Sequence, residues 1–580
     1  MSKRILFVLA SPEYLRYYDT TMTALVDRGN TVLVGVNSLR ERKHARLSEL
    51  IADSRIEIVG KIATRDDLWV HWARAVRGTF DFVRYLHPRL AGASALRERA
   101  KRKSAPRLVW GLNRIRTLSP RALDRIYGVL RLAEAAIPAS VRLRRFLEAT
   151  RPDLVVVSPL VDSMSNQVDM VRAAQSLGIP AALAVASWDN LTNKGHLRVV
   201  PDAVMVWNEH QKQEAVSLHG VPPDRVVVTG AQLFDRWFDR EPSQSRASFA
   251  AMVGLPNDRP FVLYTGSSIF IARSEYEVPF VRRWLTALRG SEVAELRDAA
   301  VLIRPHPFNS QAWEEADFSE WGPVAVWPRQ RYTPASETSR DSLFDSLKYS
   351  SAVVGINTSA MIEAAILRKP VFSVVTPDFA RTQEGTVHFH YLLPENGGFL
   401  RVASSFEDHL VQLADILAHP DAAREQLDRF VASFIRPNGL TKAATPKLCD
   451  ALEHAAAMHV VARRDGFGVR VLRIGLWPLA AITAWLSPSL DDDGKPRDAW
   501  WRGVGPARER LVKRFMIRPM RTGRKVLAGG MRALVKRSRR GRHALRTVLL
   551  RVRRAMRHAR YHVAVRLRGI APTDGTDGRS

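Results

Sequence analysis

Short runs of apolar, mostly β-branched residues alternate with helix-like stretches along this chain, and the alternation occurs in two successive series. Most of the runs are continuously apolar, which is typical of strands covered by helices on both faces. Strands that alternate with helices favour a parallel sheet. In the first series the expected strands are Ile5–Ala10, Thr31–Val36, Ile56–Gly60, Asp153–Ser158, Ala181–Ala186, Ala203–Trp207 and Arg225–Thr229.

The second series begins after a stretch rich in proline and serine, residues 239–258, which has the composition of an interdomain linker. Two such series predict an α/β protein with two Rossmann-like, doubly wound domains facing a cleft. The second series has the expected strands Phe261–Thr265, Ala300–Arg304, Val324–Trp327, Ala352–Ile356 and Pro370–Val375, with helices over Glu275–Arg289 and Ala360–Leu367 and around Ser342–Tyr349, Ser405–Ala418 and Asp421–Phe434.

The predicted domains are residues 1–238 and 259–462, because 580 residues exceed what one ordinary core holds. The first domain carries an Arg-rich helical insertion at residues 66–150, which either caps the domain or faces the acceptor or the membrane. A helix near Thr445–Val461 either closes the second domain or crosses back onto the first. Residues 463–580 form a basic tail.

Charge is concentrated in that tail. The chain has a net charge of +30, and the segment from Arg502 to Arg568 holds 23 Lys and Arg against one acidic residue, which leaves only +8 for the rest. Aromatic residues are scarce in this segment, so nucleic acid is not an expected partner. The single cysteine, Cys449, cannot form an internal disulfide, which is compatible with a reducing compartment.

An uncharged apolar run of 13 residues, Ile474–Leu486, precedes the basic segment. It is too short to span a bilayer but suits the interface, with Trp477 and Trp485 at headgroup depth. Basic amphipathic stretches such as Arg532–Lys536 and Leu545–Val552 suit anionic lipid. We therefore expect a membrane-associating tail and no ordinary transmembrane helix; the alternative is a disordered basic tail without a partner.

The segment Gly355-Ile356-Asn357-Thr358-Ser359 links an expected strand to an expected helix, and Glu363 lies one turn into that helix. Backbone N–H groups and hydroxyls at such a turn suit a phosphate group, and the carboxylate can reach a ribose. The alternative is structural: Thr358 or Ser359 caps the helix and Glu363 completes a capping box.

A second segment, Arg304-Pro305-His306-Pro307, follows the strand that ends at Arg304. Its prolines restrict the backbone, so the imidazole of His306 is held in place. A histidine there can neutralise phosphate charge as a leaving group departs, and Arg304 can add charge-assisted hydrogen bonds. The alternative is a histidine satisfied structurally at a strand end.

These two segments resemble GT-B glycosyltransferases, and are most similar to the branch with capsule and teichoic-acid-type transferases, CDP-glycerol glycerophosphotransferases and UDP-N-acetylglucosamine 2-epimerases. The Arg-x-His-Pro element resembles that of glycerophosphate, sialic acid and Kdo transferases. The resemblance covers roughly residues 1–460 as architecture. It implies a donor nucleotide in the second domain, with Asn357, Thr358 and Ser359 at the phosphates, Glu363 at the ribose, and His306 at the phosphate or acting as an acid.

Two further polar segments follow expected strands. Thr382–Phe389 offers Gln383, Glu384 and His388 to the donor's sugar, unless it is a solvated loop. In the first domain, Ser187–Gly195 clusters an aromatic, a carboxylate, an amide and a cation, which suits a sugar or another acceptor. Its expected acceptor-binding residues are Trp188, Asn190 and Lys194.

Inverting transfer needs a general base on the acceptor hydroxyl, and Asp189 is the first choice. Asp162 and Glu13, which follow other strands, are the alternatives. A structural interpretation is also open, in which Asp189 and Asn190 form an Asx turn. Metal-ligand spacings, a dinucleotide fingerprint and a phosphate loop are not found in the sequence, so no metal and no cofactor are expected.

The sequence thus predicts a cytoplasmic, bacterial-type glycosyltransferase, peripheral on the inner face of the cell membrane. It would move a sugar from a nucleotide-activated donor to a surface-glycan or lipid-linked acceptor. The alternatives are a CDP-polyol glycerophosphotransferase-like enzyme, a sugar-nucleotide epimerase of the same fold, and a non-catalytic scaffold that binds sugar nucleotides or membranes. The sugar, the nucleotide base, the acceptor and the stereochemistry stay open.

Overall fold

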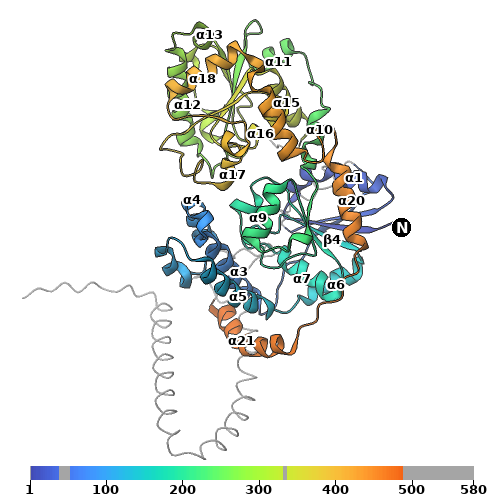
Figure 1. The fold of residues 1–580 in the computed structure, drawn as a ribbon. Coiled ribbons are helices and arrows are strands. Elements are labelled where there is room, and N and C mark those ends of the chain that lie inside the picture. Colours follow the sequence, from blue (N-terminus) through green and yellow to red (C-terminus); the bar gives the residue numbers. More distant parts are fainter. Residues whose placement is uncertain (1, 38–52, 331–335, 487–580) are drawn as a thin grey trace, which may run out of the picture. The chain divides into compact units, whose positions relative to one another are not determined.

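The computed structural model describes residues 2–37, 53–330 and 336–486. They form two parallel sheets covered by helices (Figure 1), so the predicted fold class is confirmed. The first sheet has seven strands in the order β3-β2-β1-β4-β5-β6-β7. Its strands are β1 (Arg4–Leu9), β2 (Thr31–Val36), β3 (Glu57–Lys61), β4 (Leu154–Ser158), β5 (Ala181–Ala184), β6 (Ala203–Val206) and β7 (Val226–Val228).

The first sheet is buried on both faces. In β1, Ile5 and Phe7 pack into the core on one face, and Leu6 and Val8 pack into a separate core on the other. Because both faces are buried, the sequence of β1 after Arg4 is continuously apolar and does not alternate between apolar and polar residues.

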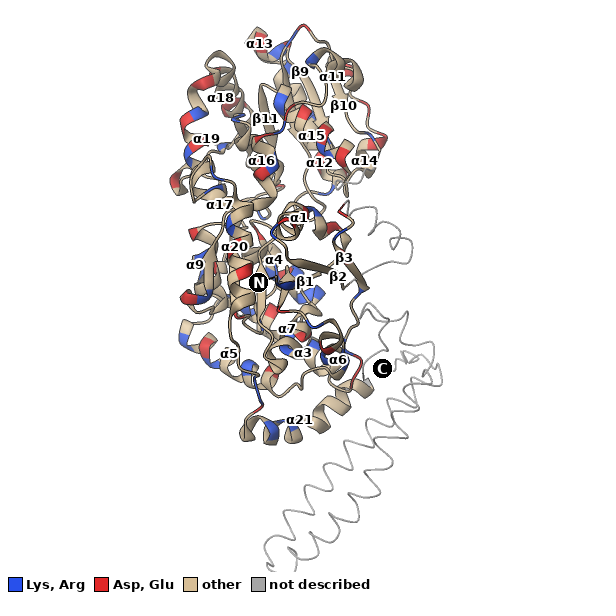
Figure 2. Cartoon of the chain, turned by 90° about the vertical axis from the view of Figure 1, so that its right-hand side faces the viewer, with Lys and Arg blue, Asp and Glu red and all other residues tan. Residues whose placement is uncertain are grey.

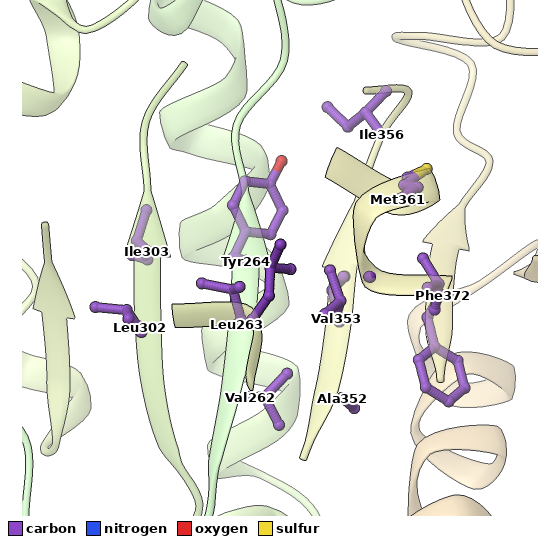
Figure 3. Packing of buried hydrophobic residues seen from close by; sticks show 14 of the residues in the cluster. Val262, Leu263, Tyr264, Leu302, Ile303, Ala352, Val353, Ile356, Met361 and Phe372 are labelled. Carbon is purple, nitrogen blue, oxygen red and sulfur yellow. The ribbon is translucent and has the colours of Figure 1, made fainter. Parts of the chain in front are cut away.

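The second sheet repeats the arrangement with six strands in the order β10-β9-β8-β11-β12-β13. Figure 3 shows apolar side chains of four neighbouring strands packed in its core, among them Leu302, Leu263, Val353 and Phe372. The short strand β13 is not among the expected strands. The bounds are β8 (Phe261–Thr265), β9 (Ala300–Arg304), β10 (Val324–Val326), β11 (Ala352–Gly355), β12 (Val371–Val374) and β13 (Arg401–Ala403).

Helices follow most strands, as the alternation predicts. In the first domain they are α1 (Asp19–Asp27), α3 (Val70–Val83), α4 (Ser94–Lys103), α5 (Pro120–Ala135), α6 (Val141–Thr150), α7 (Gln167–Leu177), α8 (Asn190–Asn193), α9 (Glu209–His219) and α10 (Asp235–Phe238). Further on they are α11 (Arg246–Val253), α12 (Ser274–Arg289), α13 (Ala294–Arg297), α14 (Gln311–Glu314), α15 (Glu337–Tyr349), α16 (Ala360–Ile366), α17 (Val387–His390), α18 (Phe406–Ala418), α19 (Arg424–Phe430), α20 (Ala444–Ala457) and α21 (Phe467–Leu486).

The helical insertion is fastened to the first domain by a buried ionic network. Arg77 of α3 pairs with Glu134 of α5 at 2.9 Å and with Asp169 of α7 at 2.8 Å. Arg65 donates to the same Asp169 at 3.0 Å. Because buried charges are stable only when paired, this network holds α3 and α5 against the sheet's own helix layer.

Two segments between the domains differ from simple linkers. The stretch 239–258 contains helix α11, whose Phe249 and Val253 belong to the core of the second domain. Helix α20 crosses back onto the first domain, where Leu448 and Cys449 pack with the core around β1. The second of the two alternatives for this helix is therefore observed.

Helix α21 begins at Phe467, earlier than the uncharged run, and includes Arg470 and Arg473. By length and composition alone, Phe467–Trp485 is sufficient to cross a membrane. This differs from the expectation of a segment too short to span. The expected basic helices around Arg532–Lys536 and Leu545–Val552 lie outside the described residues.

Candidate functional site

Three neighbouring strands bring the two sequence segments to one edge of the second sheet. β9 and β11 both pair with β8 in parallel, so their carboxyl ends lie side by side. His306 follows β9, and Asn357, Thr358 and Ser359 follow β11. The imidazole-bearing segment and the hydroxyl-bearing turn are therefore on the same edge, where ligands bind in such sheets.

Gly266 permits close packing under this edge. Its N–H donates to the carbonyl of Arg304 at 2.8 Å. A Cβ added to Gly266 would lie 2.9 Å from the nitrogen of His306 and 3.1 Å from the Cα of Pro305. Only a residue without a side chain fits between the end of β8 and the segment that carries His306.

His306 is presented as a neutral hydrogen-bond donor. The N–H of Phe308 donates to its Nδ1 at 3.2 Å, so the neutral ring carries its proton on Nε2. Burial lowers the pKa of His306 to about 4, and the nearby positive charge of Arg16 acts in the same direction. A phosphate beside the ring would raise that pKa, because a nearby negative charge favours the imidazolium form.

Arg16 is a site residue that the sequence did not single out. It lies in the 3-10 helix Pro12–Tyr17 after β1, and its Nη2 donates to the hydroxyl of Tyr17 at 2.6 Å. Its charge acts on Glu363 and His306 of the second domain. The sequence signal for Arg16 is its position shortly after the first strand, three residues beyond Glu13.

Glu363 is the most perturbed carboxyl among the predicted donor-binding residues. Burial raises its pKa to about 7, against the lowering effect of Arg16 and Arg304. Ser359 occupies the N-cap position of α16 without a side-chain cap hydrogen bond, so capping by Ser359 is not observed. Thr358 accepts only a long bond of 3.5 Å from the N–H of Ala360.

The guanidinium of Arg304 points to α15 and donates hydrogen bonds to its serines. Its Nη1 donates to the hydroxyls of Ser342 and Ser346, at 3.0 and 3.2 Å, and to the carbonyl of Ser342 at 3.2 Å. Direct contact between Arg304 and the donor stays a prediction. Arg304 still lowers the pKa of Glu363, so it acts on the site through its charge and by anchoring α15.

Asn357 and Gln383 are buried and hydrogen-bond within the second domain, and their contact with the donor stays a prediction. The amide of Asn357 donates to the carbonyl of Thr382 at 2.9 Å. That of Gln383 donates to the carbonyls of Ile356 and Val374, each at 3.2 Å. These bonds fasten the loop after β12 to the end of β11. Glu384, in the same loop, is exposed.

Asp189 is held as an ionised carboxylate. It accepts from the hydroxyl of Ser187 at 2.7 Å and from the amide of Asn193 at 3.3 Å. Burial raises its pKa, but the neighbouring His388 and Lys194 and these hydrogen bonds outweigh burial and lower the pKa below its ordinary value. Asn190 donates to the same carboxylate at 3.4 Å and is itself buried.

Trp188 and His388 join the two halves of the site. Their rings meet edge to face, with centroids 4.5 Å apart. The Nε2 of His388 lies 3.4 Å from the amide nitrogen of Asn357. Burial lowers the pKa of His388 to about 4, although Asp189 opposes this. The predicted acceptor side and the predicted donor side are therefore in contact.

Lys194 is already paired. Its ammonium donates to Asp162 at 2.6 Å and to the hydroxyl of Tyr14 at 3.0 Å. Contact between Lys194 and an acceptor stays a prediction, and Asp162, one alternative base, is paired with the ammonium of Lys194. Tyr14 lies in the same 3-10 helix as Arg16 and contacts the ring of Tyr17.

The insertion reaches the site from the side through α4. Arg99 donates to the carbonyl of Asn193 and places its guanidinium 4.1 Å from the ring centroid of Phe270 in the second domain. Arg381 of the second domain donates to the hydroxyl of Ser94 at 3.4 Å.

Within residues 2–37, 53–330 and 336–486, no group of three or more His, Cys, Asp or Glu could hold a metal ion.

No family model and no curated protein matches this chain. Among solved structures it is similar to a UDP-GlcNAc 2-epimerase from Neisseria meningitidis bound to UDP-GlcNAc, at 14% identity and TM-score 0.44, covering 77% of this chain and 99% of that one. It is also similar to the MnaA–UDP co-structure from S. aureus, at 13% identity and TM-score 0.45, covering 80% and 98%. A glycosyltransferase from Rickettsia africae has 10% identity and a TM-score of 0.43, with 79% and 100% covered.

Proposed function

We propose that this chain is a glycosyltransferase that moves a sugar from a nucleotide-activated donor to an acceptor hydroxyl. The observation that carries the proposal is the grouping of Arg16 from the first domain with Glu363 and His306 from the second. A fixed cation, a neutral imidazole donor and a carboxyl that titrates near neutrality form a set suited to a nucleotide's phosphates and ribose.

The donor's phosphates would lie between Arg16 and His306, next to the hydroxyls of Thr358 and Ser359. Glu363 would accept hydrogen bonds from the ribose hydroxyls. As the bond between the anomeric carbon and the phosphate oxygen breaks, negative charge grows on the leaving phosphate. Arg16 stabilises that charge, and the Nε2–H of His306 donates to it.

The acceptor would enter beside Trp188, where Asp189 takes the proton from its hydroxyl. The acceptor oxygen then bonds to the anomeric carbon while the nucleotide leaves with the phosphate oxygen. The low pKa of Asp189 keeps it ionised and ready to accept a proton, although it makes the carboxylate a weaker base. The contact between the rings of Trp188 and His388 supports a base close to the proposed donor half of the site.

We further propose that the acceptor is a surface glycan or is linked to lipid, and that the enzyme works on the cytoplasmic face of a membrane. The support is compositional: 23 Lys and Arg between Arg502 and Arg568 suit an anionic lipid surface. These residues lie outside the described part of the chain.

Nucleotide binding tests the donor site. Thermal shift and calorimetry with UDP, CDP, GDP, CMP and dTDP should identify one base that binds wild type. Arg16→Ala should weaken that binding by about tenfold or more, since a charge-assisted contact contributes about 1.5–3 kcal/mol. Arg283→Ala, which removes an exposed partner of Asp378, is the matched control and should bind as wild type. Equal affinity in both variants would exclude Arg16 from the site.

Turnover separates the remaining functions. With the sugar form of the nucleotide that binds, the enzyme should release the nucleotide, and faster when an acceptor is supplied. His306→Ala should lose this turnover, whereas His419→Ala, a change at an exposed histidine, should retain it. A sugar product altered at C2 without transfer would identify an epimerase. Binding that survives without any turnover would indicate a scaffold.

A further inference from the structure

Helix α21 presents an apolar stripe to solvent. Phe467, Val471, Ile474, Ile482 and Trp485 recur at the spacing of one helix face, and all are exposed. Phe467 is 84% and Ile474 is 74% exposed. A helix on the surface of a water-soluble domain normally turns polar residues outward. A continuous apolar stripe on the outer face marks a site of interaction.

The opposite face of α21 packs on the helical insertion. Leu476 and Ala480 join a small core with Trp69, Ala73 and Ile137. Figure 1 and Figure 2 both show α21 beside α3 of the first domain. The helix is therefore a folded part of this domain with one apolar face exposed, rather than an extension of the basic tail.

Polar bonds also fasten the helix. Arg473 donates to the carbonyl of Ala136 at 2.7 Å and pairs with Asp465 at 2.5 Å. A helix that crossed a bilayer would have to give up both contacts and carry Arg473 into hydrocarbon, which is costly. The contacts favour a helix that lies flat, with its inner face on the protein.

We propose that α21 is a membrane-docking helix that lies in the interface plane and buries Phe467, Val471, Ile474 and Ile482 of the stripe among the acyl chains of an anionic lipid surface. The helix contains no acidic residue. Trp477 and Trp485 are both exposed, and such rings favour headgroup depth. Exposed Arg470 can extend its charge to the headgroups.

The positive charge of the segment that follows α21 favours an anionic lipid surface, rather than a second copy of the chain, as the partner of this stripe. The segment with 23 Lys and Arg and one acidic residue begins at Arg502 and follows α21 after residues 487–501. Two copies joined through α21 would bring two such segments together and repel each other. An anionic lipid surface attracts the same segments, each cation contributing on the order of 1 kcal/mol near the surface.

The orientation that follows is specific. Because α21 packs on the insertion of the first domain, docking would turn this domain toward the lipid. The inference concerns membrane attachment and is independent of the donor site, so either can fail without the other.

The test uses the full chain and vesicles of phosphatidylcholine, with or without phosphatidylglycerol. Ile474→Glu should weaken co-sedimentation with phosphatidylglycerol vesicles by about tenfold or more, because one buried isoleucine contributes about 1.5–3 kcal/mol. Val411→Glu is the matched control: Val411 on α18 of the second domain is 73% exposed, and its change should leave binding unaltered.

A second measurement reports depth. Cys449 is fully buried, so a maleimide dye attaches selectively to a thiol introduced by Ile474→Cys or by Val411→Cys. Phosphatidylglycerol vesicles should shift the emission of the dye to the blue at position 474 and not at 411. Unchanged emission at both positions in vesicle-bound protein would show that the tail alone docks. If wild type is a dimer, and Ile474→Glu is a monomer that still binds vesicles, the stripe joins two copies of the chain. Either result overturns the proposal.

Discussion

Trp188 and His388 meet edge to face, with ring centroids 4.5 Å apart and ring planes at 86°. One residue belongs to each domain, and both are buried. Asp189 follows Trp188 directly and lowers the cost of protonating His388, while His388 lowers the pKa of Asp189. Movement of one domain relative to the other would therefore separate the proposed base from the proposed donor side.

Asp189→Asn should separate binding from transfer. The substitution retains the shape of the side chain and removes its ability to take a proton. The rate of transfer should fall by roughly 10²–10⁴, the usual contribution of a general base, while nucleotide affinity measured by calorimetry stays near wild type. Asn166→Asp, which replaces an amide by a carboxylate next to α7, serves as the control. A rate within about twofold of wild type would move the role of base to Glu13 or to a water.

Gly266→Ala should displace His306 without unfolding the protein. The added Cβ would stand 2.9 Å from the backbone nitrogen of His306, and backbone has little freedom to move. Overpacking of this kind costs about 1–3 kcal/mol. We expect a modest fall in Tm and a much larger loss of turnover. Gly92→Ala has open space around its Cβ and should alter neither quantity. Wild-type turnover in Gly266→Ala would show that the position of His306 is not important.

The sheets were predictable because strands buried on both faces leave an unmistakable pattern. Val301, Leu302 and Ile303 must all be apolar when each face of β9 is covered. Parallel order then places every strand's carboxyl end at one edge, so His306 and Thr358 could be expected together. Strand β13 begins with Arg401 and lacks the continuous apolar run that the equally short β7 and β10 have. Helix α11 was missed because the proline- and serine-rich composition of residues 239–258 indicated a linker.

The destinations of single side chains were not predictable, because they depend on partners far away in the sequence. Arg304 bonds to serines of α15, and Lys194 is paired with Asp162. Residue type and a place at a strand end suggested ligand contacts for both. Conversely, Arg16 becomes a site residue only when the second domain brings Glu363 opposite it. No local pattern contains that information.

Glu277→Gln should stabilise the protein progressively as the pH rises from about 5 to about 8. This carboxyl is fully buried, where it accepts from the hydroxyl of Tyr264 at 3.1 Å and from the N–H of Ser267 at 2.9 Å. Burial raises its pKa from 4.5 to about 8. A raised pKa in the folded state adds stability below the unfolded-state pKa and loses it as pH rises through the folded-state value. Glutamine cannot ionise, so the variant escapes this loss.

The stabilities of Glu277→Gln and wild type should be similar at about pH 5 and differ by about 4 kcal/mol at about pH 9, since each pKa unit corresponds to about 1.4 kcal/mol. Denaturant melts at both pH values measure the difference. Glu320→Gln, at an exposed carboxyl, should show no such dependence. A constant difference across the range would mean that Glu277 is ionised in the folded protein at both ends.

Tyr391→Phe should weaken the link between the domains in a pH-dependent way. The hydroxyl of Tyr391 donates to the buried carboxyl of Glu214, whose pKa burial raises to about 8. Without that donor the pKa of Glu214 rises further, so ionising Glu214 costs more stability in the variant. Relative to wild type, the loss in free energy of unfolding should therefore be larger at about pH 9 than at about pH 7 by roughly 1–2 kcal/mol. The loss of Tm should be larger at the higher pH as well. Tyr276→Phe, at an exposed tyrosine, is the control. Equal losses at the two pH values would show that the hydroxyl does not stabilise the ionised carboxylate.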